Sequence, residues 1–71
     1  MKSKTRIKYD WVGNFFEGLA RVELKGKWGF INKQGKVVVP IIYDDVDYFH
    51  EGLAGVKLKE KYGFINSQHE V

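Results

Sequence analysis

The sequence contains no cysteine, so disulfide bonds and thiolate-bound zinc are excluded. Only two histidines are present, His50 and His69, and no metal-ligand spacing surrounds them. Asp44, Asp45 and Asp47 form an acidic cluster, but the glycine and terminal glutamate of an EF-hand loop do not follow. The sequence therefore predicts no metal and no cofactor.

Long apolar runs are also lacking, since no segment approaches the roughly 18 residues that a membrane-spanning helix needs. Residues 1–8 are basic, but the apolar core of a secretory signal does not follow them. The absence of cysteine fits a reducing compartment. We therefore expect a cytoplasmic protein that does not enter a membrane.

The chain has 71 residues, and a domain of this size buries only about 60% of its unfolded surface. In place of disulfides it has many aromatic residues: five Phe, four Tyr and two Trp. Each large aromatic side chain can bury roughly 150–250 Å². We expect an aromatic core, self-association or both to stabilise the fold.

The most informative feature is an internal repeat. Residues 15–32 return as residues 49–66, at an offset of 34 residues without insertion or deletion. Across 15–37 and 49–71, 15 of 23 aligned positions are identical. A fixed period of this size is typical of repeat architectures. We predict one β-repeat domain over residues 1–71, in three parts: a partial unit (1–14), repeat one (15–48) and a truncated repeat two (49–71).

Alternating apolar and polar side chains predict half-buried strands over residues 19–25 and 27–32, with equivalents in the second copy. Residues 37–39 are all valine and predict a third strand buried on both sides. Pro40 should end its ladder pairing, because proline has no N–H to donate.

The remaining segments are expected to be connectors or edges. Residues 9–14 contain a Gly-Asn turn signal and their counterpart, residues 43–48, contains three aspartates, so both predict connectors. Residues 2–8 predict an extended edge strand. The fold class is therefore all-β: a small antiparallel β-meander with three short strands per unit, the last unit being incomplete.

The incomplete unit leads to a further expectation. We expect the second repeat to lack its third strand, so that this strand is replaced or a sheet edge is left open. Residues 2–8 align with the third-strand position of a preceding unit. They could close the sheet within the chain or pair with a second copy, and we expect a dimer or higher oligomer.

Residues 27–46 carry a recognisable pattern: Lys-Trp-Gly-Phe-Ile-Asn-Lys-Gln-Gly-Lys-Val-Val-Val-Pro, then Tyr-Asp-Asp-Val, with Glu-Gly-Leu-Ala before it. The pattern resembles the WG-containing repeat (KWG repeat) family of bacterial proteins. Trp28-Gly29 matches the signature dipeptide, and the second copy has Tyr62-Gly63. The resemblance implies a β-rich repeat unit that mediates binding, and it implies no shared catalysis.

Residues that recur in register are expected to form the core, because each unit buries the same face against its neighbour. The predicted core consists of Trp28, Phe30, Tyr62, Phe64, Leu19, Leu53, Val22 and Val56. Trp11 has no aromatic counterpart, since Asp45 occupies the equivalent position, and is therefore a candidate contact residue. The candidate partner-binding residues are Trp11, Tyr48, Lys27, Lys59 and Lys61.

Catalysis is not predicted. Ser67 and His69 lie two residues apart, a spacing without a mechanism, and Glu17 and Glu51 are better explained as acceptors for backbone N–H groups in turns. We predict a non-enzymatic protein–protein interaction module that self-associates, with an unknown protein partner. The alternative is a module that binds nucleic acid or glycan through exposed aromatic side chains and lysines.

Overall fold

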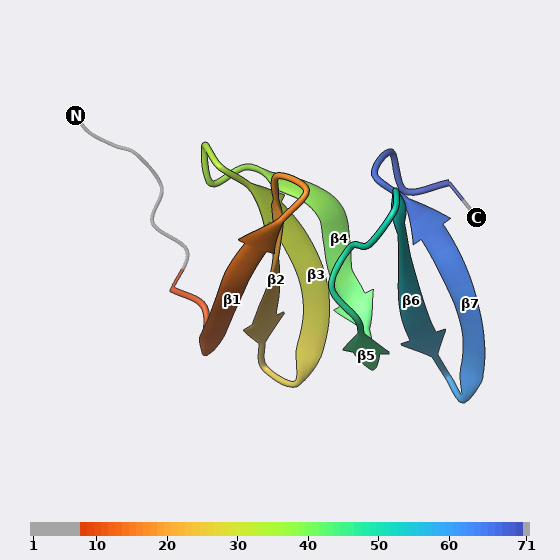
Figure 1. Cartoon of the computed structure of the whole chain (residues 1–71). Coiled ribbons are helices and arrows are strands. Elements are labelled where there is room, and N and C mark those ends of the chain that lie inside the picture. The colour runs from red at the N-terminus through yellow and green to blue at the C-terminus, as the bar shows by residue number, and fades with distance from the viewer. Residues whose placement is uncertain (1–7, 71) are drawn as a thin grey trace.

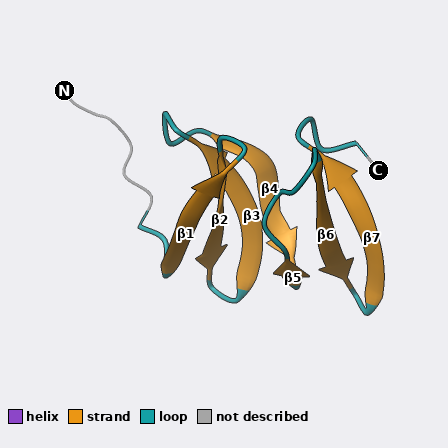
Figure 2. Cartoon of the chain, viewed as in Figure 1, coloured by secondary structure: helices purple, strands orange, loops and turns teal. Residues whose placement is uncertain are grey.

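The structure is a computed structural model that describes residues 8–70. The described residues form strands and loops without a helix, so none of them could cross a membrane as a helix (Figure 2). The all-β prediction is therefore confirmed. The strands, labelled in Figure 1, are β1 (Trp11–Phe16), β2 (Leu19–Leu24), β3 (Lys27–Asn32), β4 (Val37–Tyr43), β5 (Asp45–Val46), β6 (Leu53–Leu58) and β7 (Lys61–Asn66).

These strands form two antiparallel sheets, each a meander in which sequence neighbours pair. Sheet A has the order β1-β2-β3-β4 and sheet B the order β5-β6-β7. β1–β3 constitute unit 1 and β5–β7 constitute unit 2, because each element of one lies 34 residues from its counterpart in the other. β4 pairs with β3 of unit 1, and the chain continues from it directly into β5 of unit 2.

The main core lies between the two sheets and contains side chains from both. Phe30 of sheet A packs edge to face against Phe49, with the ring centroids 4.6 Å apart, and both rings are almost completely buried. The buried members of this cluster are Leu19, Phe30, Val39, Tyr43, Val46, Phe49, Ala54, Val56 and Ile65. A smaller cluster of Ala20, Val22 and Ile31 lies beneath Tyr9 and Ile41.

The β1–β2, β2–β3 and β6–β7 hairpins use tight turns in which both central residues have positive φ. Glu17 and Gly18 have φ of 54° and 81°, and Lys25 and Gly26 repeat this pattern. Such turns match the right-handed twist of the flanking strands. The β6–β7 turn keeps the same conformation although its second residue is Glu60, with φ of 69°. An L-residue is strained there, because its Cβ crowds the backbone.

The connector prediction is wrong for residues 11–14, which belong to β1. β1 pairs with β2 through Trp11↔Glu23 and Val12↔Val22, and the register shifts before Phe15. This irregularity breaks the period-two alternation that identifies a strand in sequence. The connector prediction also fails for residues 43, 45 and 46, which end β4 and form β5.

The third strand is longer and less buried than predicted. β4 continues past Pro40 to Tyr43, because a register irregularity between Phe30↔Val39 and Trp28↔Tyr43 accommodates the proline. Val37 is exposed whereas Val39 is fully buried, so the strand is not covered on both faces. The edge strand predicted over residues 2–8 lies almost wholly outside the described residues, and Lys8 belongs to no strand.

Candidate functional site

The two units present the same face to different surroundings. In unit 1, the face that carries Leu19 and Phe30 packs against sheet B, and these side chains are 6% and 0% exposed. Their counterparts in unit 2, Leu53 and Phe64, are 48% and 65% exposed. Tyr62, the counterpart of the partly buried Trp28, is 80% exposed. We call the exposed side of Leu53, Tyr62 and Phe64 the outer face of sheet B.

The prediction that all repeated residues form the core is therefore wrong for Leu53, Tyr62 and Phe64. The repeat fixes which face of a unit is apolar, but burial requires a neighbour on that face. Unit 1 has unit 2 as its neighbour, and among the described residues nothing packs equivalently on unit 2. Val22 and Val56 are buried because they point to the opposite faces of their sheets.

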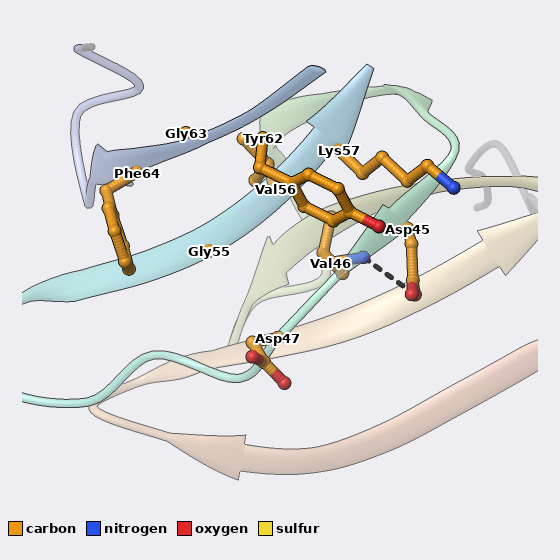
Figure 3. Close-up of a pocket in the computed structure, with 9 residues that line it drawn as sticks. All are labelled: Asp45, Val46, Asp47, Gly55, Val56, Lys57, Tyr62, Gly63 and Phe64. Atoms are coloured by element: carbon orange, nitrogen blue, oxygen red, sulfur yellow. Dashed lines mark hydrogen bonds between the residues drawn. The ribbon is translucent and has the colours of Figure 1, made fainter. Parts of the chain in front are cut away.

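A hollow of about 380 Å³ lies on the outer face of sheet B (Figure 3). The residues around it come from β5 and the loop after it, from β6, and from β7. They are Asp45, Val46, Asp47, Gly55, Val56, Lys57, Tyr62, Gly63 and Phe64. The ring of Tyr62 extends across β6 toward Asp45, while Phe64 stands at the other end of the hollow.

The hollow exists because unit 2 lacks two side chains that fill this place in unit 1. There, the Arg21 guanidinium carbon lies 5.1 Å from the Trp11 ring centroid and 5.8 Å from that of Trp28. Trp11 and Trp28 also pack edge to face at 5.4 Å. In unit 2, Gly55 takes the position of Arg21 and Asp45 that of Trp11.

The chemistry of the hollow follows from these replacements. An exposed tyrosine ring and two carboxylates, Asp45 and Asp47, surround a floor made by a glycine, and such a site suits a cationic or apolar group. Lys57 already places its ammonium nitrogen 5.6 Å from the Tyr62 ring centroid. The carboxylates repel phosphate groups, which makes the hollow a poor site for nucleic acid.

The candidate partner-binding residues do not form one site. Trp11 is 42% exposed and holds the Arg21 guanidinium, whereas Tyr48 stacks on Phe16 with ring centroids 4.6 Å apart. Whether either residue contacts a partner stays a prediction. Neither lines the hollow.

The three candidate lysines lie around Asp44 and the β6–β7 hairpin. The Lys27 ammonium group donates to Asp44 Oδ1 at 2.7 Å, and the Lys59 backbone N–H donates to Asp44 Oδ2 at 2.8 Å. These hydrogen bonds, first that of Lys27 and then that of Lys59, hold the pKa of the Asp44 carboxyl below its usual value. Lys61 begins β7 and is exposed. Lys27 is thus engaged in an ion pair that a phosphate ligand would have to break.

Sequence reasoning missed Gly55, Asp45 and Asp47 as residues of a site. The available signal was the set of positions at which the two copies differ, namely Arg21 and Gly55, Trp11 and Asp45, and Gly13 and Asp47. Within residues 8–70, no group of three or more histidine, cysteine, aspartate or glutamate side chains is placed to hold a metal ion.

Comparison with known proteins identifies the repeat. The family described as WG containing repeat matches the chain twice, over residues 5–28 and 28–62. Both matches end at the signature aromatic position, Trp28 in the first and Tyr62 in the second. No curated protein and no solved structure matches the chain significantly.

Proposed function

Because the chain belongs to the WG-containing repeat family, we propose that it is a non-catalytic protein–protein interaction module that self-associates. The observation that carries this proposal is the exposed outer face of sheet B. Three large apolar side chains lie together there, and their counterparts in unit 1 are covered by another unit. Contiguous exposed apolar surface on a small domain marks an interaction site.

The energetic argument favours a protein surface as the partner. Burying one large apolar side chain contributes about 1.5–3 kcal/mol relative to leaving it exposed. A domain of this length has only about 3–5 kcal/mol from its core. Covering Tyr62 and Phe64 would therefore add a large fraction of the stability that the fold has by itself.

The test is the mass of the chain in solution as a function of concentration. We expect the weight-average mass to rise above the single-chain value of 8.3 kDa between micromolar and millimolar concentration, as measured by sedimentation equilibrium. Phe64→Ser should weaken this association. Ile42→Ser is the matched control, because Ile42 is also exposed, at 46%, but lies on β4.

Two results would count against the proposal. A mass of one chain at every concentration would exclude self-association in this range. Equal association by the Phe64→Ser and Ile42→Ser variants would show that the outer face of sheet B is not used. Capture of single-stranded nucleic acid with an affinity that falls steeply with salt would instead support the alternative function.

A further inference from the structure

The joint between the two units is made by β4. This strand lies on the outer edge of β3, with Phe30 opposite Val39 and Trp28 opposite Tyr43. It passes so close to Gly29 that a Cβ there would lie 2.6 Å from the Val39 carbonyl oxygen and 2.8 Å from that of Pro40. Gly29 is thus required by the close approach of the β4 backbone.

β7 repeats this edge of β3, and none of residues 8–70 pairs with it. Gly63 repeats Gly29, yet a Cβ at Gly63 would meet no atom within 4 Å. Within the described residues no strand pairs with the outer edge of β7 (Figure 1). Phe64, which repeats the fully buried Phe30, is 65% exposed. In the part of the chain that the structure describes, unit 2 therefore has the edge for a β4-like strand without the strand.

The sequence contains one further β4-like segment, residues 3–9, located 34 residues before β4. The buried or partly buried positions of β4 are Val38, Val39, Ile41 and Tyr43, and the corresponding residues are Lys4, Thr5, Ile7 and Tyr9. The exposed positions of β4 are Val37, Pro40 and Ile42, and the corresponding residues are Ser3, Arg6 and Lys8. Residues 3–9 thus have branched or aromatic residues at three of the four buried or partly buried positions, with Lys4 at the fourth, and polar residues at the exposed positions.

The residue that follows residues 3–9 makes the same contacts as the residue that follows β4. After β4, Asp44 donates its N–H to the Lys57 carbonyl and accepts from the Lys59 N–H at 2.8 Å. Asp10 makes the same two contacts, with the Glu23 carbonyl and the Lys25 N–H, also at 2.8 Å. The family match supports this alignment, since the two matched ranges, residues 5–28 and 28–62, end at equivalent aromatic positions.

The segment cannot reach β7 of its own chain, because β1 and β7 lie at opposite ends of the molecule (Figure 1). Seven residues span at most about 25 Å when fully extended. The intervening strands of sheet A alone occupy about 15 Å, at roughly 4.8 Å per strand, and sheet B lies beyond them. Residues 3–9 can therefore add to the β7 edge of another copy but not to that of their own.

Resting on the self-association proposed above, we infer that residues 3–9 of a second copy add to the outer edge of β7 as β4 adds to β3, so that copies join head to tail. Two other contacts between the units would recur at this joint. Phe49 packs on Phe30, and Phe15 of the second copy, 42% exposed in the single chain, would pack on Phe64. The Gly52 N–H donates to Glu17 at 2.8 Å, and the Gly18 N–H of the second copy would donate to Glu51.

Two contacts of the internal joint would not recur. Arg21 donates to the Val46 carbonyl at 3.4 Å, but Gly55 replaces it in unit 2. Phe16 stacks on Tyr48, whereas His50 and Asn14 occupy the corresponding positions. The joint between copies is therefore weaker than the joint within the chain, and association should depend on concentration. A head-to-tail contact does not close on itself in a dimer, so oligomers larger than dimers should form.

The test uses variants of each side of the joint in the full chain. Thr5→Asp places a carboxylate at the position equivalent to the fully buried Val39, and should weaken association about ten-fold or more. Ser3→Asp makes the same charge change at the position equivalent to the exposed Val37, and should have less than about a two-fold effect. Gly63→Val should fold, since nothing lies near its Cβ, but should block the approach of the added strand.

Mixing completes the experiment. The Thr5→Asp variant keeps an intact β7 edge, and the Gly63→Val variant keeps an intact N-terminal segment. Each should remain at the mass of one chain when alone, and an equimolar mixture should form a complex of two chains that does not grow further. Circular dichroism of each variant checks that the strands are retained.

The outcomes separate the two proposals. If Thr5→Asp associates as well as Ser3→Asp, or if the mixture stays at the mass of one chain, strand addition is wrong. If only the Phe64→Ser variant then loses association, self-association through the outer face of sheet B is still supported. A wild-type chain that remains a single chain at all concentrations overturns both.

Discussion

Gly29 and Gly63 occupy equivalent positions in two nearly identical strands, and substitution of each by alanine should have opposite effects on stability. A Cβ at Gly29 would lie 2.6 Å from the Val39 carbonyl oxygen, 2.8 Å from that of Pro40 and 2.9 Å from the Ile41 Cα. All three atoms belong to the backbone, so the whole of β4 must move away. Overpacking of this kind typically costs about 1–3 kcal/mol.

Gly63→Ala meets no atom within 4 Å. Replacing a strand glycine by alanine reduces the entropy of the unfolded chain, and φ at Gly63 is not positive, so stability should rise by about 0.4–1 kcal/mol. The two variants should therefore differ by about 1.5–4 kcal/mol, which is comparable with the whole stability of a domain of this length.

Urea unfolding followed by tryptophan fluorescence measures the difference directly, because Trp28 lies on β3 beside Gly29 and pairs with β4 at Tyr43. The measurement is made at a concentration at which the chain is monomeric, so that association does not contribute to the unfolding free energy. Equal unfolding midpoints for Gly29→Ala and Gly63→Ala would refute the close approach of β4 to Gly29.

Two further predictions concern the turn and the ion pair. Glu60→Gly should raise the unfolding free energy by about 0.5–1 kcal/mol, because it removes the strain of an L-residue at φ of 69°. Gly26→Ala should lower the unfolding free energy by about 1 kcal/mol. Urea midpoints measure both effects, and a decrease for Glu60→Gly would contradict the turn assignment. The Lys27 hydrogen bond lowers the pKa of Asp44 in the folded state, so its stabilising effect is fully present above the ordinary pKa near 4 and is lost as the pH falls through the lowered value. Wild-type stability should therefore decrease more between pH 5 and about pH 2.5 than that of Asp44→Asn, and parallel pH profiles would contradict this assignment.

The sequence was sufficient to predict the strands that alternate cleanly. β2 and β3 come from regular alternation between turn signals, and the exact 34-residue offset carries both predictions to β6 and β7. Only the first part of β4 was predicted, from its three valines, because Pro40 reads as the end of the strand. β1 was not predicted, because its register irregularity before Phe15 removes the alternation, and Gly13-Asn14 reads as a turn in isolation. The pairing of β1 with β2 is a tertiary property that these residues do not reveal locally.

Burial could not be predicted from the repeat alone. Leu53, Tyr62 and Phe64 belong to the same sequence pattern as Leu19, Trp28 and Phe30, and a pattern gives the face of a strand but not what covers it. The hollow on the outer face of sheet B was also hidden, since it arises from the absence of an arginine and a tryptophan at Gly55 and Asp45. A site formed by missing side chains is visible only beside the unit that retains them.

The positions at which the two copies agree and those at which they differ lie in different parts of the structure. The residues that form the joint through backbone and apolar contacts, such as Gly29 and Phe30, are repeated in unit 2 as Gly63 and Phe64. The residues that fill the surface beside the joint are not repeated: Arg21 becomes Gly55 and Trp11 becomes Asp45. On the strand addition proposed above, unit 2 repeats the residues that accept a strand, while the chemistry around them differs. A partner that docks on the outer face of sheet B would meet two features: an acceptor edge common to both units and a hollow that only unit 2 has. The edge would determine the orientation in which the partner binds, and the hollow would determine which side chain the partner must place there.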